Sequence, residues 1–345
     1  MYKPSDTLDN NLNTSILQIG GENPYVSIVM PSYNASNYIR DSIESILRQD
    51  FENFELIIAD DCSNDNTIEI ISSFKDKRIR LIHTEQNTGS AKYPRELAIE
   101  HSRAPYICWI DSDDTVDPNY LSQLLTTKIN TKANIVCSQM LAERNGHIQY
   151  TLPKDDFNYN SIVSGRDAVM MTLDRAWKIN LNGWLCDKEI WMNTSSYKNL
   201  NIIHMDADDF SAREILYKAA SVAFCKVAYH YRLHPDAITK KISTKKFESV
   251  ITDRLVLEYF KPKYPEAIPL IQRTLCSRMI ALMRIFSINI AHLTHEDQLY
   301  SKNLLQKYFN KIRMADILQA DIPFKFKILL MMPFNWTLTA MKIIN

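Results

Sequence analysis

Residues 25–139 alternate between short apolar runs rich in β-branched residues and segments with helical apolar spacing, and this alternation constrains the fold most. The apolar runs predict five strands, at residues 25–30, 54–59, 79–83, 106–110 and 133–139. The segments between them predict four helices, at residues 36–49, 64–74, 90–102 and 118–128. Strands alternating with helices form βαβ units, so we expect an α/β fold with a mostly parallel sheet and flanking helices.

The second half of the chain has a different pattern. Beyond residue 145 the alternation is less regular, with helices predicted at residues 164–171 and 209–219 and a strand at residues 221–231. From residue 244 onward the pattern is nearly all helical. Residues 240–345 carry 17 basic and 8 acidic side chains, whereas the whole chain is balanced at 40 of each. We therefore expect a basic helical C-terminal extension on an acidic α/β body.

Composition excludes several classes of protein. Zero formal charge argues against a nucleic-acid-binding protein. The six cysteines form no CxxC pair and have no zinc-type spacing, which fits a reducing compartment. The N-terminal residues have no apolar stretch of signal-peptide type, and no run approaches the ~18 apolar residues of a membrane span. These features predict a cytoplasmic protein.

Polar and acidic residues follow each of the first four predicted strands, in the segments PSYN (31–34), DDCSND (60–65), NTGS (87–90) and DSDD (111–114). Ligands of open α/β sheets bind outside the carboxyl ends of the strands. Asp111, Asp113 and Asp114 would repel one another unless a cation lies between them, although such acids also occur as plain helix caps. Carboxylates that leave room for substrate phosphates suit Mg²⁺ or Mn²⁺. We therefore expect a metal–diphosphate site at this edge.

The order and spacing of four segments resemble those of family 2 glycosyltransferases with the GT-A fold: YVSIVMPSYN (25–34), FELIIADDCSND (54–65), NTGSAKYPR (87–95) and YICWIDSDDTVDP (106–118). The resemblance is strong over about residues 24–140 and weaker to about 240. It implies inverting transfer of a sugar from a nucleotide-diphosphate donor, with UDP as the expected nucleotide, to an acceptor hydroxyl. The expected acceptor is a glycan, or a glycan on a polyprenyl diphosphate, in cell-surface polysaccharide biosynthesis.

This resemblance also divides the chain. Residues 1–23 would be a flexible leader, residues 24–240 the GT-A domain with a nucleotide-binding half (24–140) and an acceptor half (141–240), and residues 241–345 the extension. Two other functions remain open at this point. One is a nucleotide-sugar-binding scaffold without catalysis. The other is a nucleotidyltransferase, which normally carries a Gly-rich basic loop that PSYNASN (31–37) does not provide.

The resemblance implies roles for individual residues. Pro31 and Tyr33 would line the nucleotide site, Asp61 would read the base edge, and Arg95 would lie near the diphosphate or the base. Asp111 and Asp113 match the DxD element of the family, with Asp113 and Asp114 as the expected contacts to ribose and metal. Asp208 or its neighbour Asp209 would be the general base, and Asp206 is a third candidate because the motif reads DADD and not Glu-Asp.

Three further positions call for structural comparison. Cys62 stands where the family usually has Gly, Glu96 replaces a common Asn, and Pro94 interrupts an expected helix start. In YHYRLH, His230 and His234 flank Arg232, but a strand followed by a loop does not bring two such histidines together on one metal. Arg232 would meet a phosphate or form a surface ion pair.

The C-terminal segment, residues 322–345, carries lysines and aromatic residues and no acid. This composition suits an amphipathic segment at a membrane interface. We therefore expect peripheral attachment to the cytoplasmic face of the membrane. A helical cap on the catalytic domain and a dimer contact are the alternatives.

Overall fold

The structure is a computed structural model that describes residues 22–153, 157–174, 182–197, 199, 207–234, 242–320 and 322–341. The expected leader lies outside the described residues, except for residues 22 and 23. The described chain divides into two compact units. The first contains the described residues of 22–169, 182–199 and 211–234, and the second contains those of 170–174, 207–210 and 242–341.

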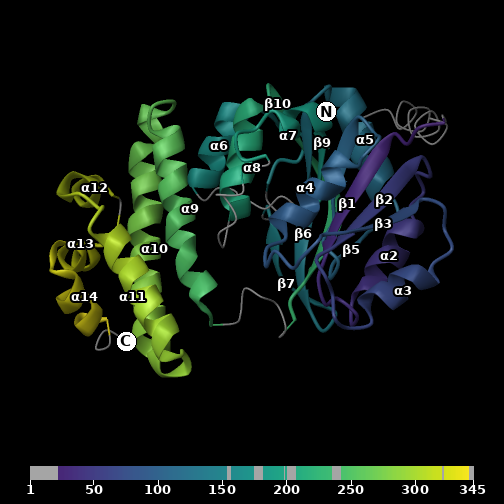
Figure 1. Cartoon of the computed structure of the whole chain (residues 1–345). Helices are drawn as coiled ribbons and strands as arrows, with labels where there is room; N and C mark the ends of the chain where they lie inside the picture. The colour runs from purple at the N-terminus through teal and green to yellow at the C-terminus, as the bar shows by residue number, and fades with distance from the viewer. Residues whose placement is uncertain are drawn as a thin grey trace. The chain divides into compact units, whose positions relative to one another are not determined.

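The first unit is built on a ten-stranded sheet with the order β3-β2-β1-β4-β9-β6-β10-β5, in which β7 also pairs with β6 and β8 with β10 (Figure 1). Neighbours β3, β2, β1 and β4 are parallel, and so are β6 and β10. β9 runs antiparallel between β4 and β6. Six strands therefore share one direction, which confirms the expected mostly parallel α/β sheet. The strands are β1 (Val26–Ser32), β2 (Phe54–Asp60), β3 (Ile79–His83), β4 (Tyr106–Trp109), β5 (Thr115–Val116), β6 (Ile135–Arg144), β7 (His147–Leu152), β8 (Ile162–Ser164), β9 (Trp184–Asp187) and β10 (Ser221–Arg232).

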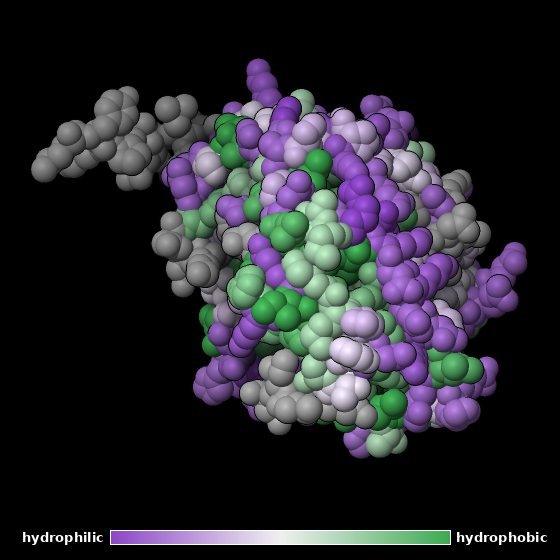
Figure 2. Space-filling view, turned by 90° about the vertical axis from the view of Figure 1, so that its left-hand side faces the viewer, coloured by the Kyte–Doolittle hydropathy of each residue, from purple (hydrophilic) through white to green (hydrophobic). Residues whose placement is uncertain are grey.

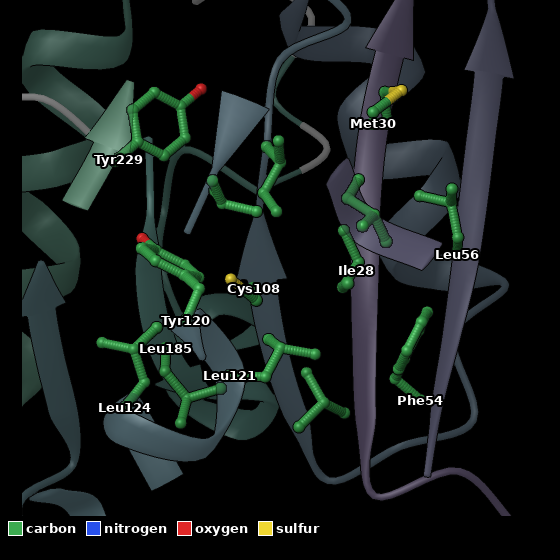
Figure 3. Packing of buried hydrophobic residues seen from close by; sticks show 14 of the residues in the cluster. Ile28, Met30, Phe54, Leu56, Cys108, Tyr120, Leu121, Leu124, Leu185 and Tyr229 are labelled. Carbon is green, nitrogen blue, oxygen red and sulfur yellow. The ribbon is translucent and has the colours of Figure 1, made fainter. Parts of the chain in front are cut away.

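Helices cover this sheet because each has an apolar stripe. In α2, Ile39, Ile43 and Ile46 are fully buried at helical spacing. α4 packs on β1 and β2, and α5 packs on β6 and β10. Side chains from β1, β2, β4, α5 and β10 meet in one core, which Figure 3 shows at close range. The helices up to β10 are α2 (Ile39–Leu47), α3 (Thr67–Ser73), α4 (Lys92–Glu100), α5 (Tyr120–Thr131), α6 (Gly165–Leu173), α7 (Lys188–Met192) and α8 (Ala207–Lys218).

Pro94 does not interrupt its helix, contrary to expectation. It occupies the third position of α4, within the first turn, where backbone N–H groups have no partner inside the helix and a missing donor costs little. Glu96, two positions further on, forms a buried ion pair with Lys92 at 2.5 Å. The Lys92 ammonium also donates to the carbonyl of Ser196. The fold therefore accommodates both Pro94 and Glu96 within α4.

The second unit is helical and has its own core, to which Phe247, Met279, Met283, Phe286 and Leu305 contribute. α10 lies against α9, α11, α12 and α14. The helices from α9 onward are α9 (Thr244–Phe260), α10 (Ile268–Asn289), α11 (His295–Phe309), α12 (Met314–Gln319), α13 (Phe324–Met331) and α14 (Phe334–Ala340). Among the described residues, the helix Pro265–His292, which contains α10, is long and apolar enough to cross a membrane, with a mean hydropathy of 1.3. Buried core helices share that property, and 44% of its apolar window is buried here.

Candidate active site

Three carboxylates gather at the carboxyl edge of the sheet, directly after β4. The ligand atoms of Asp111, Asp113 and Asp114 lie within 4.8 Å of one another. The edge is shared with the ends of β1 and β2, because these strands run parallel to β4. We call Asp111, Asp113 and Asp114 the acidic cluster. Such a set of carboxylate donors suits a hard divalent cation.

Asp114 is the buried member of this cluster. Its Oδ2 accepts a hydrogen bond from the Tyr229 hydroxyl at 2.6 Å, and its Oδ1 accepts one from the Arg232 backbone N–H at 2.8 Å. Burial raises the pKa of Asp114 well above its usual value, and the charges of Asp113 and Asp111 raise it further. A divalent cation would relieve this crowding of negative charge, so the residues present fit the expected metal.

Asp111 is fixed from two sides. The indole Nε1–H of Trp109 donates to its Oδ1 at 2.7 Å, and the side-chain amide of Asn182 donates to its Oδ2 at 2.6 Å. Arg95, which is buried on α4, places Nη2 4.0 Å from the same Oδ1 and stacks its guanidinium on the Trp109 ring. The structure therefore brings Arg95 into the acidic cluster's surroundings, where its positive charge offsets part of the cluster's negative charge.

Asp113 is the half-exposed tip of the cluster, and His234 lies beside it with Nε2 2.9 Å from its Oδ2. The His234 ring packs on Tyr38, with ring centroids 4.3 Å apart. His230 does not converge with His234. Its two ring nitrogens instead lie 2.6 Å from Glu143 Oε1 and 2.9 Å from Asp117 Oδ1.

Arg232 forms an ion pair, which is one of its two expected roles. Its guanidinium forms an ion pair with Asp41 at 3.3 Å and lies over the Tyr38 ring. His230 also lies near the end of β10. Burial alone would lower the pKa of His230, but its hydrogen bonds to Asp117 and Glu143 outweigh this effect and leave the pKa raised. The end of β10 is therefore tied to the acidic cluster and to neighbouring acids by several side chains.

The expected nucleotide residues lie at the ends of β1 and β2. Pro31 is buried within β1. Tyr33 is the first residue after this strand and is 44% exposed, which leaves its ring accessible to a ligand. Asp61 is buried, and its carboxylate accepts hydrogen bonds from the Thr84 hydroxyl and from the Thr88 backbone N–H and hydroxyl, all between 2.9 and 3.1 Å. Asp61 therefore orders the loop after β3.

Cys62 occupies the turn after β2 where the family usually has glycine, and its backbone conformation there is unfavourable for a residue with a side chain. Its φ is +61°, in the left-handed region that favours glycine. Asn34, after β1, also has a positive φ and accepts a hydrogen bond from the Asn64 N–H. The thiol of Cys62 contacts the Thr84 carbonyl at 3.4 Å.

The candidate base residues belong to the second unit. Asp208 and Asp209 stand in the first turn of α8, and Asp206 lies outside the described residues. Asp209 pairs with Arg278 at 3.4 Å, and Arg278 is held in turn by Asp253 at 2.8 Å.

Three residues around the cluster were not predicted as site residues: Tyr229, Asn182 and His234. Each is more than 70 positions from its carboxylate in the chain, so no local pattern links them. Asn182 precedes Gly183, where an added Cβ would lie 2.3 Å from the Tyr120 hydroxyl. A glycine is therefore needed at that close approach.

Comparisons with known proteins agree with this architecture. Residues 27–178 match the family described as glycosyl transferase family 2. The chain is 30% identical over 186 residues, 52% of this chain and 73% of the relative, to the Escherichia coli UDP-Glc:alpha-D-GlcNAc-diphosphoundecaprenol beta-1,3-glucosyltransferase WfgD. The structure resembles Staphylococcus aureus TarS 1–349 in complex with UDP-GlcNAc, with a TM-score of 0.66, 17% identity and coverage of 92% of this chain and 88% of that one.

A second solved structure has the same fold. The mannosyltransferase PcManGT from Pyrobaculum calidifontis, in complex with GDP-Man and Mn²⁺, gives a TM-score of 0.51 at 13% identity over 98% of this chain and 94% of that one. The chain belongs to glycosyl transferase family 2 and has the GT-A fold with C-terminal helices. It spans between 36% and 54% of the length of three other curated relatives.

Proposed function

We propose that the protein is an inverting glycosyltransferase that moves a sugar from a UDP-linked donor to an acceptor hydroxyl. The observation that carries this proposal is the acidic cluster at the carboxyl edge of the sheet, with the Arg95 guanidinium beside Asp111. Negative charge develops on the diphosphate as the anomeric bond breaks, and the cluster and Arg95 together suit a diphosphate held through a cation. Family membership supports the same reaction class.

The cluster would hold Mn²⁺ or Mg²⁺ through Asp113, with Asp114 behind it. The ion would neutralise charge on the leaving diphosphate as a Lewis acid. The protein's own contribution is positioning: Trp109 and Asn182 fix Asp111, and Tyr229 fixes Asp114. Groups that are already oriented need not reorganise when the charge develops, which is the main source of electrostatic catalysis.

The nucleotide would occupy the ends of β1 and β2. The exposed ring of Tyr33 offers a surface for the base, and Pro31 lies two residues earlier at the end of β1. Asp61 would contact the base edge, as the family resemblance implies. Its hydrogen bonds to Thr84 and Thr88 support this role indirectly, because they hold its carboxylate in one orientation.

The acceptor hydroxyl needs a base, since it is a poor nucleophile at neutral pH. We assign this role to Asp208, with Asp209 as the second candidate. Both residues stand in the DADD motif that the family resemblance relates to the base, in the first turn of α8. Inversion follows from a single displacement in which the hydroxyl attacks opposite the leaving diphosphate.

The proposed acceptor is a lipid-linked glycan in cell-surface polysaccharide biosynthesis, at the cytoplasmic face of the membrane. The support is the name of the relative WfgD, which acts on a diphosphoundecaprenol-linked sugar. The basic C-terminal extension supports the same location, because anionic lipids attract clustered Lys and Arg residues.

Donor hydrolysis tests the proposal. We expect the wild-type protein with Mn²⁺ to release UDP from at least one member of a UDP-sugar panel. Asp208→Asn should bind that donor normally but turn it over on the order of 100-fold more slowly. Asp209→Asn is the matched variant one residue away and should lose less. Donor binding without any turnover by the wild type, with acceptor supplied, would favour a non-catalytic sugar-nucleotide scaffold.

A further inference from the structure

The last three helices carry an unusual concentration of exposed apolar side chains. Six of the fifteen exposed large hydrophobic residues in the described part of the chain fall within residues 314–336. Figure 2 looks onto the side of the molecule where α12, α13 and α14 lie, and apolar side chains gather there among hydrophilic ones. The six are Met314, Leu318, Phe324, Ile328, Met331 and Trp336, and we call them the apolar face.

These side chains are not part of the core that the same helices build. α12 and α13 bury Ile317, Leu329 and Leu330, whereas Phe324 is 76% exposed and Ile328 is 46% exposed. Phe324, Ile328 and Met331 follow the i, i+4, i+7 spacing of one helical stripe, as Met314 and Leu318 do on α12. α13 is therefore apolar on both sides. A helix with apolar side chains on both sides is typical of helices that contact a second apolar environment besides their own core.

Cations border the apolar face. Lys325 and Lys327 lie on α13, and residues 322–341 contain no acid. A pocket of about 510 Å³ opens next to the start of α12 and is lined by Arg254, Lys261 and Arg313 together with Leu257, Glu258 and Pro262. Arg254 pairs with Glu258 at 2.7 Å and Arg313 with Asp316 at 3.0 Å, so the charge of Lys261 makes the pocket basic. Arg313 is also the residue that precedes the exposed Met314. The pocket and the apolar face therefore meet at the N-terminus of α12.

This charge pattern selects one occupant. A second copy of the chain would bring Lys325 and Lys327 against their own counterparts. Among the described residues 314–341 the one acid is Asp316, which is buried and already paired with Arg313 at 3.0 Å. An anionic bilayer supplies both missing partners, since acyl chains cover exposed aromatic and aliphatic groups and phosphates receive the cations.

We propose that α12, α13 and α14 lie in the headgroup region of an anionic bilayer, with Phe324, Ile328 and Trp336 inserted and the pocket of Arg254, Lys261 and Arg313 receiving a lipid phosphate. The proposal deepens the proposed function, because a lipid-linked acceptor resides in a bilayer, and it rests on that function only for the choice of the cytoplasmic leaflet.

Flotation with vesicles tests this inference on the full chain. Wild-type protein should float with phosphatidylcholine vesicles that contain phosphatidylglycerol, and much less with pure phosphatidylcholine. Phe324→Ser combined with Trp336→Ser should lower the bound fraction at limiting lipid by about tenfold. The matched control is Ile148→Ser on β7, which removes a side chain that is 55% exposed and outside the face, and it should float like the wild type.

The basic pocket has its own variant. Lys261→Gln should weaken binding to the anionic vesicles and leave the residual binding to phosphatidylcholine unchanged. Equal flotation of the wild type and the double variant would overturn the proposal. So would a wild-type dimer in sedimentation that the double variant abolishes, because the face would then join two copies. The assay contains no sugar nucleotide, so loss of donor hydrolysis would contradict the proposed function without affecting this result.

Discussion

Replacing Tyr229 with phenylalanine tests how the acidic cluster is held. The hydroxyl of this fully buried residue accepts the Asp111 backbone N–H at 3.2 Å and donates to Asp114 at 2.6 Å. Tyr229→Phe keeps the ring and leaves two groups without that partner. Each buried polar group that loses its partner costs about 1–3 kcal/mol, so for two groups we expect the free energy of unfolding to fall by about 2–6 kcal/mol.

Tyr229→Phe should also weaken metal binding. Without the hydroxyl, Asp114 is no longer fixed beside Asp113, and we expect the affinity for Mn²⁺ to fall about tenfold, which corresponds to ~1.4 kcal/mol. Urea unfolding measures the first effect, and calorimetric titration with Mn²⁺ and UDP measures the second.

Tyr120→Phe is the control for this experiment. Its hydroxyl is equally buried but bonds to Ser138 and to the Gly183 carbonyl, so stability should fall to a similar extent while Mn²⁺ affinity stays within about twofold. Mn²⁺ affinity of Tyr229→Phe equal to that of the wild type would refute the reasoning. Equal losses of affinity in both variants would mean that the effect comes from the fold as a whole.

Two further predictions concern stability. Cys62→Gly should raise the free energy of unfolding by about 0.5–1 kcal/mol, because glycine removes the cost of a positive φ, and urea unfolding of Cys62→Ala, which keeps that cost, should show no gain. His230 has a raised pKa in the fold through Asp117 and Glu143, so its stabilising contribution is complete below its unfolded pKa of about 6.5 and is lost as the pH rises through the folded value. The stability difference between the wild type and His230→Gln should therefore shrink as the pH rises above 6.5, and a difference that is constant or grows over that range would contradict the assignment.

The regular part of the fold could be predicted from sequence because local patterns determine it. β3 has its predicted bounds, β2 and β4 begin at the predicted residue and end within one residue of the prediction, and β1 differs by one residue at its start and two at its end. β9 could not be predicted. It has four residues, WLCD, and exists because it pairs antiparallel with β4 and β6, which are distant in sequence. β5, with two residues, is defined only by its pairing with β10.

The candidate site divides in the same way. The DSDD segment identified the acidic cluster, because three carboxylates after a buried strand are visible in any sequence. Which carboxylate is buried was not visible, since Tyr229 and Arg232 reach Asp114 from more than 110 residues away. The pairing of His234 with Asp113 is equally remote in sequence. Side chains that orient a site come from tertiary packing, which a single sequence does not display.

Calorimetric titration of UDP in the presence of Mn²⁺, with the wild type and Asp113→Ala side by side, tests the central claim most directly. Asp113 is the half-exposed carboxylate of the cluster, so its removal should abolish the part of UDP binding that depends on Mn²⁺. We expect wild-type binding to weaken when EDTA is added and the variant to be indifferent to it. UDP binding by Asp113→Ala with wild-type affinity and the same dependence on Mn²⁺ would contradict the claim that this cluster holds the metal.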